Sequence, residues 1–242
     1  MNYHDVLARL GVTNAHPGGK QITELWLQSV TIPAGASVLD VGCGNGATAC
    51  LAAKRWHADV TALDLRKRMV ENTKRRAVRE GVRLKAIQGS AESLPFRDGT
   101  FDFLICESVL VFVRPEQALH EFQRVLKPGG QVVDVEMMTL GPVTQEWRNR
   151  VKSVYGATHV PDLNGWRSYF HQAGFGVRVI RSGPIASLSM SGNQQDPVVA
   201  DLNAFSDPQV LQIVETNGRW LQENQHTLGY GIFLLTKSNS ET

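Results

Sequence analysis

The sequence predicts an α/β fold in which helices cover both faces of a mostly parallel, doubly wound sheet. Strand-like and helix-like segments alternate from residue 37 to residue 136, and alternation at this pitch is typical of crossover units that build a parallel sheet. The chain has 242 residues, of which 42% are hydrophobic and 20% are charged, so it can bury a sizeable core. A glycine-rich turn, "GCGNG", separates the first strand from the first helix of this alternating region.

The individual elements follow from local patterns along the chain. We expect strands where short apolar runs are bounded by turn residues, and helices where longer amphipathic segments lie between them. Proline in the first turn favours a helix that begins at Pro115, and "KPGG" (Lys127–Gly130) should break that helix before the next strand. The expected order is strand Ser37–Val41, helix Ala47–Arg55, strand Val60–Asp64, helix Lys67–Glu80, strands Arg83–Gln88 and Phe101–Glu107, helix Pro115–Leu126 and strand Gln131–Glu136.

Beyond residue 136 the elements are more widely spaced. Helix Asp162–Ala173 should end at Gly174, a common capping residue, and strands Val177–Ile180 and Leu228–Thr236 should flank helix Pro208–Asn224. Connections of such length are often lids or binding elements. We therefore expect an N-terminal helical lid over residues 1–36 and a domain over residues 37–242, with substrate-covering inserts at about 140–161 and 183–224.

Composition and charge narrow the possible functions. The formal net charge of +2 is too small to indicate nucleic-acid binding, and the basic run at 66–76 has the spacing of a solvated helix face. The longest apolar runs are strand-sized, far below the ~20 residues of a membrane span, and no secretory pattern opens the chain, so we expect a cytoplasmic protein. Cys43, Cys50 and Cys106 show no paired spacing, so neither a disulfide framework nor a metal site is predicted.

The glycine-rich turn carries the first chemical signal. Glycine allows positive φ and close approach of a ligand to the backbone, and the following helix offers unpaired N–H groups to an anion. "GCGNGA" fits the dinucleotide pattern G-x-G-x-x-G/A, and Asp64 ends the next strand 22 residues after Gly42. A carboxylate at that place can accept hydrogen bonds from ribose hydroxyls. The pattern therefore predicts a nucleoside with an anionic appendage, and an NAD(P)-dependent oxidoreductase is one enzyme that fits.

Several further motifs occur in a fixed order: "VLDVGCGNG", "ALDL", "GSAESLPFRDGTFDFLICESVL" and "FQRVLKPGG". Together they resemble the class I S-adenosylmethionine-dependent methyltransferases, in particular the ubiquinone-methylase-like branch that acts on small molecules. The resemblance covers Val38 to Glu136, with a weaker match at "WRSYFHQAGF". It implies a Rossmann-like, doubly wound, mostly parallel seven-stranded sheet. It also implies transfer of a methyl group from S-adenosylmethionine to a small, largely apolar acceptor. Two alternative functions stay open: an NAD(P)-dependent oxidoreductase, and a non-catalytic module that binds S-adenosylmethionine.

The resemblance assigns roles to single positions. It places Asp40 and the glycines of the turn along the methionine moiety, Asp64 on the ribose, Leu65 on the adenine face and the segment after the third strand at the adenine edge. The family usually has an acidic residue where this chain has Ser90, so we expect adenine recognition to rely more on the N–H of Ala91. The expected cofactor-binding residues are Asp40, Gly42, Gly44, Gly46, Asp64, Leu65, Ser90, Ala91, Glu92, Glu107 and, from "AHPGGKQIT", Gly19.

Few residues could act as a base on the acceptor. Glu107 ends a strand at the expected mouth of the site and His16 lies in a segment that could close over it. Glu136 ends the next expected strand and is a weaker candidate, whereas His159 and His171 suit structural roles. The inserts should roof an apolar pocket, or supply ordinary core, through Met137, Met138, Trp147, Tyr155, Leu188, Met190, Phe205 and Trp220. The Asn/Asp-Pro-Pro-Tyr/Phe motif of nucleic-acid amino-methylases is absent, so no nucleic-acid partner is expected.

Overall fold

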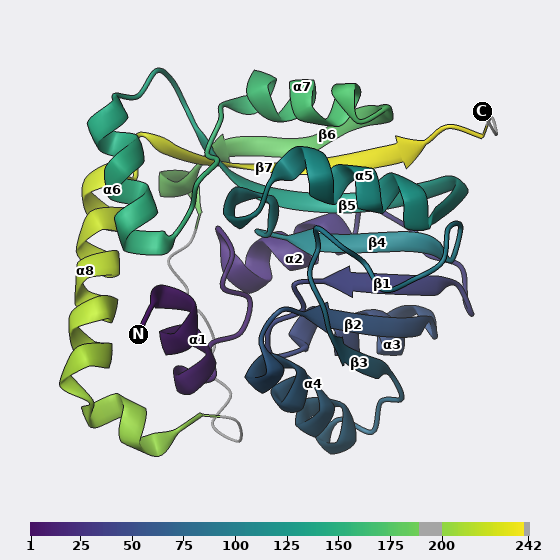
Figure 1. Ribbon diagram of the computed structural model, residues 1–242, viewed down its shortest axis with the longest axis horizontal. Helices are drawn as coiled ribbons and strands as arrows, with labels where there is room; N and C mark the ends of the chain where they lie inside the picture. The colour runs from purple at the N-terminus through teal and green to yellow at the C-terminus, as the bar shows by residue number, and fades with distance from the viewer. Residues whose placement is uncertain (189–199, 240–242) are drawn as a thin grey trace.

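A computed structural model describes residues 1–188 and 200–239 of the chain. Its centre is a seven-stranded sheet with the order β3-β2-β1-β4-β5-β7-β6 (Figure 1). Strands β3, β2, β1, β4 and β5 run parallel, and β7 runs antiparallel to both β5 and β6. This arrangement confirms the predicted fold class. The strands are β1 Ser37–Val41, β2 Asp59–Asp64, β3 Lys85–Gln88, β4 Phe101–Glu107, β5 Leu126–Thr139, β6 Phe175–Pro184 and β7 Leu228–Lys237.

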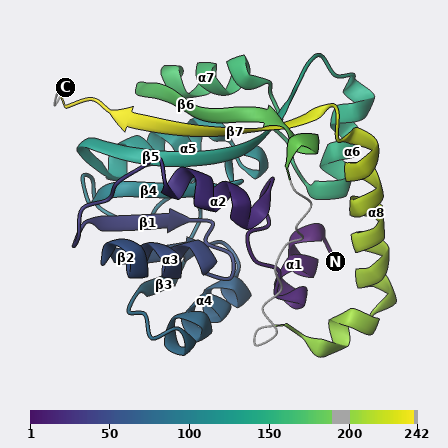
Figure 2. The ribbon, with the colours of Figure 1, turned by 180° about the vertical axis from the view of Figure 1, so that it is seen from behind.

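Helices cover both faces and one end of the sheet. Val38 and Leu39 are both fully buried but belong to different core clusters, because successive strand residues point to opposite faces. One face packs against α5 and α7, and the other against α2, α3 and α4 (Figures 1 and 2). The described helices are α1 Tyr3–Leu10, α2 Gly19–Leu27, α3 Ala47–Trp56, α4 Lys67–Arg79, α5 Pro115–Val125, α6 Gln145–Tyr155, α7 Leu163–Gln172 and α8 Pro208–Asn224, with short 3-10 turns at Leu110–Phe112, Ile185–Ser187 and Leu202–Ser206.

Strand β5 differs from the sequence-based expectation at both ends. It begins at Leu126, so "KPGG" does not separate helix from strand. The register with β4 instead shifts there, since Phe101 pairs with Leu126 but Phe103 with Gln131, and Gly129 adopts a φ of 73°. The irregularity is a bulge. At the other end β5 continues to Thr139, because pairing with β7 extends over the whole of Gln131–Thr139.

Segments from both ends of the chain meet beyond the carboxyl ends of the parallel strands. Helix α1 lies beside α8, as both views show (Figures 1 and 2), and Val6 and Leu10 share a small core cluster with Val210. Arg9 joins the two segments, since its Nη1 lies 2.6 Å from Asp207 Oδ2 and its Nε 3.3 Å from an oxygen of Asp201. The N-terminal segment is thereby held against the 183–224 insert.

The two inserts contain regular structure. Helix α6 lies within 140–161 and is capped at its N-terminus by Thr144, whose side chain accepts a hydrogen bond from the N–H of Trp147. Trp147 and Trp220 pack together with ring centroids 5.5 Å apart, so these two aromatic residues join α6 to α8 in the core. Met190 lies outside the described residues. No helix in the described ranges is long and apolar enough to cross a membrane.

Candidate functional site

The turn after β1 is a tight glycine bend. The N–H groups of Gly42 and Cys43 both donate to the carbonyl of Leu63, at 2.8 and 3.0 Å. Gly42, Gly44 and Gly46 have φ values of 70°, 53° and 74°, in the left-handed region that favours glycine. A Cβ on Gly42 would overlap the side chain of Val109, whereas one on Gly44 would meet nothing within 4 Å. The backbone around Gly44 therefore stays open to a ligand.

Asp64 at the end of β2 is bound to this turn. Its Oδ2 accepts a hydrogen bond from the N–H of Gly44 at 3.0 Å, and its Oδ1 accepts one from the N–H of Arg66 at 2.8 Å. Burial raises the pKa of this carboxyl above its usual value. Each carboxylate oxygen can accept a second hydrogen bond, so Asp64 still has acceptor capacity for ligand hydroxyls.

Two adjoining cavities border this bend. The larger has a volume of about 530 Å³ and the smaller of about 110 Å³. Both lie at the carboxyl ends of the parallel strands, the usual place for ligands in open α/β sheets. The residues that line both cavities, and so mark where they meet, are His4, Gly42, Asp64, Arg66, Ser108 and Phe112.

The smaller cavity is acidic. Asp40, Asp64 and Glu107 line it. Asp40 is only 3% exposed, and its Oδ2 has no hydrogen-bond partner among the described residues. Burial, and secondarily the negative charges of Glu107 and Asp64, raise the pKa of Asp40. An unsatisfied buried carboxylate oxygen beside two further carboxyl groups suits a cationic ligand with N–H donors.

Glu107 and His16 also line the smaller cavity, but other groups already hold them. Glu107 Oε1 accepts hydrogen bonds from Thr23 Oγ1 and Trp26 Nε1, both at 2.8 Å, and Oε2 accepts one from Thr48 Oγ1 at 2.6 Å. His16 Nε2 lies 3.0 Å from Thr23 Oγ1 and 3.4 Å from Glu107 Oε1. These contacts fix helix α2 against β4 and α3, so Glu107 is well placed to position neighbouring groups.

The remaining predicted binding residues divide into two groups. Ser90, Ala91 and the 59% exposed Leu65 line the larger cavity. Glu92 lines neither cavity. Its Oε1 instead accepts hydrogen bonds from the backbone N–H and the Nε–H of Arg114, both at 2.9 Å. Gly19 lines neither cavity. Gly46 also lies away from both, and packs beneath the turn against Thr73.

Sequence reasoning named Tyr155 of α6 as a residue that could roof the pocket, but missed the residues that α1 contributes. Tyr3 lines the larger cavity, with its ring 4.9 Å from that of Tyr155, and His4 lines both cavities, with its ring 4.4 Å from that of Phe112. Burial, and secondarily the charge of Arg66, lower the pKa of His4 to about 4. Apolar residues at 3, 6, 7 and 10 have helical spacing, and this signal could have revealed an amphipathic helix docked near the site.

Glu136 is not part of either cavity, and its expected place at a strand end is wrong because β5 continues to Thr139. The side chain is fully buried, and its Oε1 accepts hydrogen bonds from the N–H groups of Val109 and Leu110, at 2.9 and 2.7 Å. Val109 and the neighbouring Ser108, which has a φ of 60°, line the larger cavity. Glu136 therefore positions the wall of the cavity from beneath.

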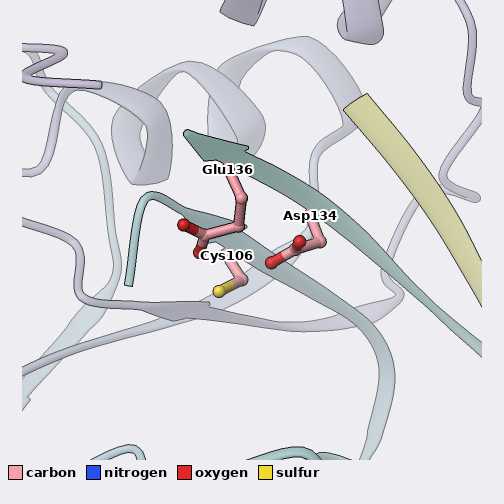
Figure 3. A group of neighbouring side chains, drawn as sticks. All are labelled: Cys106, Asp134 and Glu136. Atoms are coloured by element: carbon pink, nitrogen blue, oxygen red, sulfur yellow. The ribbon is translucent and has the colours of Figure 1, made fainter. Parts of the chain in front are cut away.

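Glu136 belongs to a buried group with Cys106 and Asp134 (Figure 3). One ligand-type atom of each lies within 4.8 Å of the others. Both oxygens of Asp134 and Oε2 of Glu136 have no hydrogen-bond partner in the described part of the chain. Burial raises the pKa of Asp134 to about 7, and it also raises the pKa values of Glu136 and Cys106 well above their usual ranges. Neutral, protonated side chains account for this closed group.

Several known proteins are similar to this chain in sequence. The model of a family described as a methyltransferase domain matches residues 39–134. The chain is 30% identical over 236 residues to an uncharacterised methyltransferase of Bacillus subtilis, YodH, and the match covers 97% of this chain and 99% of the relative. It is 29% identical over 197 residues to the ubiquinone/menaquinone biosynthesis C-methyltransferase UbiE of Brucella abortus, covering 74% of this chain and 73% of that protein.

Solved structures agree with the fold. A phosphoethanolamine N-methyltransferase 2 of Haemonchus contortus, solved in complex with S-adenosyl-L-methionine, superposes with a TM-score of 0.70 at 16% identity, covering 98% of this chain and 56% of that one. At this identity the likeness concerns the fold, whereas the match to the Bacillus relative extends over nearly the whole sequence. The ordered motifs, the sheet and this relative together show that the chain belongs to the class I S-adenosylmethionine-dependent methyltransferases.

Proposed function

We propose that the protein transfers a methyl group from S-adenosylmethionine to a small acceptor with a largely apolar, aromatic body. The observation that carries this proposal is the meeting of an acidic cavity and an aromatic-lined cavity at Gly42, Asp64 and Ser108. S-adenosylmethionine, when bound, supplies a methyl group on a positively charged sulfonium. The membership in the methyltransferase family replaces the NAD(P)-dependent oxidoreductase as the interpretation of the glycine turn.

The donor site follows from the polar groups on the two cavities. The free Oδ2 of Asp40 would bind the ammonium of the methionine end in the smaller cavity. Asp64 would accept hydrogen bonds from the ribose hydroxyls, while Leu65 and Ala91 would contact the adenine. The open backbone at Gly44 allows a ligand to lie along the turn. Family resemblance and cavity lining support the same arrangement.

The acceptor site is the rest of the larger cavity. Tyr3, Phe112, Val113, Val154 and Tyr155 give it an apolar, partly aromatic wall. The hydroxyl of Tyr155 donates to the carbonyl of Asn217 at 3.1 Å, so its ring is held in place. Such a wall positions a flat apolar body and excludes water, and positioning of this kind can lower a barrier by about 7–11 kcal/mol. The ubiquinone and menaquinone pathway relatives support an aromatic acceptor.

We infer that His4 is the group that takes a proton from an acceptor hydroxyl or amine. It lies where the cavities meet; burial lowers the pKa of its imidazole to about 4, so the ring is neutral at pH 7 but a weaker base than an ordinary histidine. Neither ring nitrogen has a hydrogen-bond partner within 1–188 or 200–239, whereas Glu107 accepts three hydrogen bonds. Glu107 and His16, the candidates from sequence, would then bind and position the donor from the smaller cavity.

Calorimetry tests the donor site directly. We expect micromolar binding of S-adenosylmethionine and S-adenosylhomocysteine and no binding of NAD. Asp64→Ala should weaken S-adenosylhomocysteine binding by at least tenfold, about 1.4 kcal/mol, through loss of charge-assisted hydrogen bonds. Asp98→Ala is the matched control, because Asp98 is an exposed carboxylate paired with Arg124. Unchanged affinity in Asp64→Ala would contradict the donor site. A panel of phenols, naphthols and aromatic amines then tests turnover, and inactivity with all of them would contradict the aromatic acceptor.

A further inference from the structure

The two cavities share Asp64 and Arg66 but differ in the other charged side chains that line them. The smaller cavity has three carboxyl side chains, from Asp40, Asp64 and Glu107. In the larger cavity Asp64 is the single carboxyl group among the described lining residues, and it lies at the shared end. Outside the residues that the two cavities share, the larger cavity is lined by Lys152, on α6, and by Met1, Asn2 and Tyr3, at the start of α1. The acceptor end is therefore basic.

Lys152 is the charged side chain that best defines this end. It lies on α6 beside Ser153, and both line the cavity. Its ammonium has no ion pair or hydrogen bond with any residue that the structure describes. Helical neighbours at three and four residues' distance pair most readily, and for Lys152 these are Arg148, Asn149, Tyr155 and Gly156. None of them is acidic, so the helix itself does not neutralise Lys152.

Arg66 also lines the larger cavity but serves a different region. Its Nε lies 3.7 Å from Asp5 Oδ1, so a carboxylate already neutralises part of its charge. Its backbone N–H donates to Asp64, and Arg66 lines the smaller cavity as well. Arg66 therefore belongs to the shared, donor end, whereas Lys152 stands next to the aromatic wall formed with Tyr155 on the same helix.

From this placement we propose that the methyl acceptor is an aromatic acid, and that Lys152 binds its anionic group at the rim of the larger cavity. The inference rests on the proposed function, since it assigns the acceptor class of the same site. The aromatic body packs against Tyr3, Phe112 and Tyr155, and a carboxylate, sulfonate or phosphate substituent lies at Lys152. Lys152 acts as a specificity-determining residue, because it discriminates between acceptors by charge without taking part in the transfer.

Two fluorescent dyes of similar shape, one anionic and one neutral, test this assignment before the acceptor is identified. The anionic dye is 8-anilinonaphthalene-1-sulfonate and the neutral one is N-phenyl-1-naphthylamine. Each is titrated into the full chain saturated with S-adenosylhomocysteine. We expect Lys152→Met to weaken binding of the anionic dye by about two- to fivefold, within the range of one exposed ion pair, and to leave the affinity for the neutral dye unchanged. Lys152→Arg should retain the affinity for the anionic dye.

Arg150→Met is the matched control on the same helix, because Arg150 lines a neighbouring surface hollow near Trp220 and does not line the larger cavity. It should leave both dyes unchanged. The assignment is overturned if the anionic dye does not bind saturably, if Lys152→Met leaves it unchanged, or if Arg150→Met weakens it as much. Calorimetry of S-adenosylhomocysteine in the same samples separates the two proposals: its failure to bind refutes the donor site, whereas normal binding with an unchanged anionic dye refutes only the role of Lys152.

Discussion

The two glycines at the end of the turn should respond differently to the same substitution. Gly46 has a φ of 74°, and a Cβ there would lie 2.7 Å from Thr73 Cγ2 and 2.9 Å from Thr73 Oγ1. Thr73 is fully buried and its Oγ1 donates to the carbonyl of Gly44 at 2.9 Å, so it cannot move aside cheaply. Gly44 has a φ of 53° and open space at the Cβ position. Gly46→Ala therefore adds backbone strain and overlap, and Gly44→Ala adds strain alone.

The magnitudes follow from these geometries. Left-handed φ costs a non-glycine residue roughly 1–2 kcal/mol, and overpacking a buried site adds about 1–3 kcal/mol. We expect Gly44→Ala to lower the free energy of unfolding by about 1–2 kcal/mol, and Gly46→Ala by about 2–5 kcal/mol. Donor affinity should show the reverse order. Gly44 lines the smaller cavity and Gly46 does not, so a methyl group on Gly44 should weaken S-adenosylhomocysteine binding by about tenfold or more.

Urea unfolding and calorimetry of S-adenosylhomocysteine, on the same preparations, measure both quantities. Thr73→Ser removes the overlapping Cγ2 and keeps the hydroxyl, so Gly46→Ala should be less destabilising in a Thr73→Ser background. Equal unfolding free energies for Gly44→Ala and Gly46→Ala, or no relief from Thr73→Ser, would refute the steric reasoning. Equal donor affinities for the two variants would refute the assignment of Gly44 to the ligand surface.

Two further predictions concern ionisable groups. His4→Gln should lower kcat about 100-fold or more with an acceptor from the panel, while S-adenosylhomocysteine affinity stays unchanged; equal kcat values would exclude His4 as the base. Asp134 has a pKa of about 7 in the fold and about 4 when unfolded. The folded state therefore binds more protons between these values, and this carboxyl should lower wild-type stability as pH rises from about 4 to about 7, by up to about 1.4 kcal/mol per pH unit. Asp134→Asn removes that contribution, so the free energy of unfolding of the variant should increase relative to that of the wild type as pH rises. Parallel plots of unfolding free energy against pH for the two proteins would contradict a protonated Asp134.

Sequence patterns predicted the central elements because local and tertiary preferences agree there. Strand Phe101–Glu107 and helix Pro208–Asn224 have the bounds expected from sequence. The start of β5 did not follow local rules, because "KPGG" is typical of a turn but becomes a bulge once β4 pairs on both sides of it. The end of β5 depends on β7, which lies far along the chain at Leu228–Lys237. Such long-range pairing leaves no local signal.

By itself the sequence determined the fold class, the glycine bend and the place of Asp64, since each depends on spacing within one βαβ unit. Only the tertiary structure decided what surrounds the bend. It brought Tyr3 and His4 from the start of the chain and Lys152 from α6 to the larger cavity, and it placed Gly19 outside both cavities. These residues share no period or spacing along the chain. Their meeting results from the docking of α1, α6 and α8 at one end of the sheet, where side-chain packing decides which groups face the ligand.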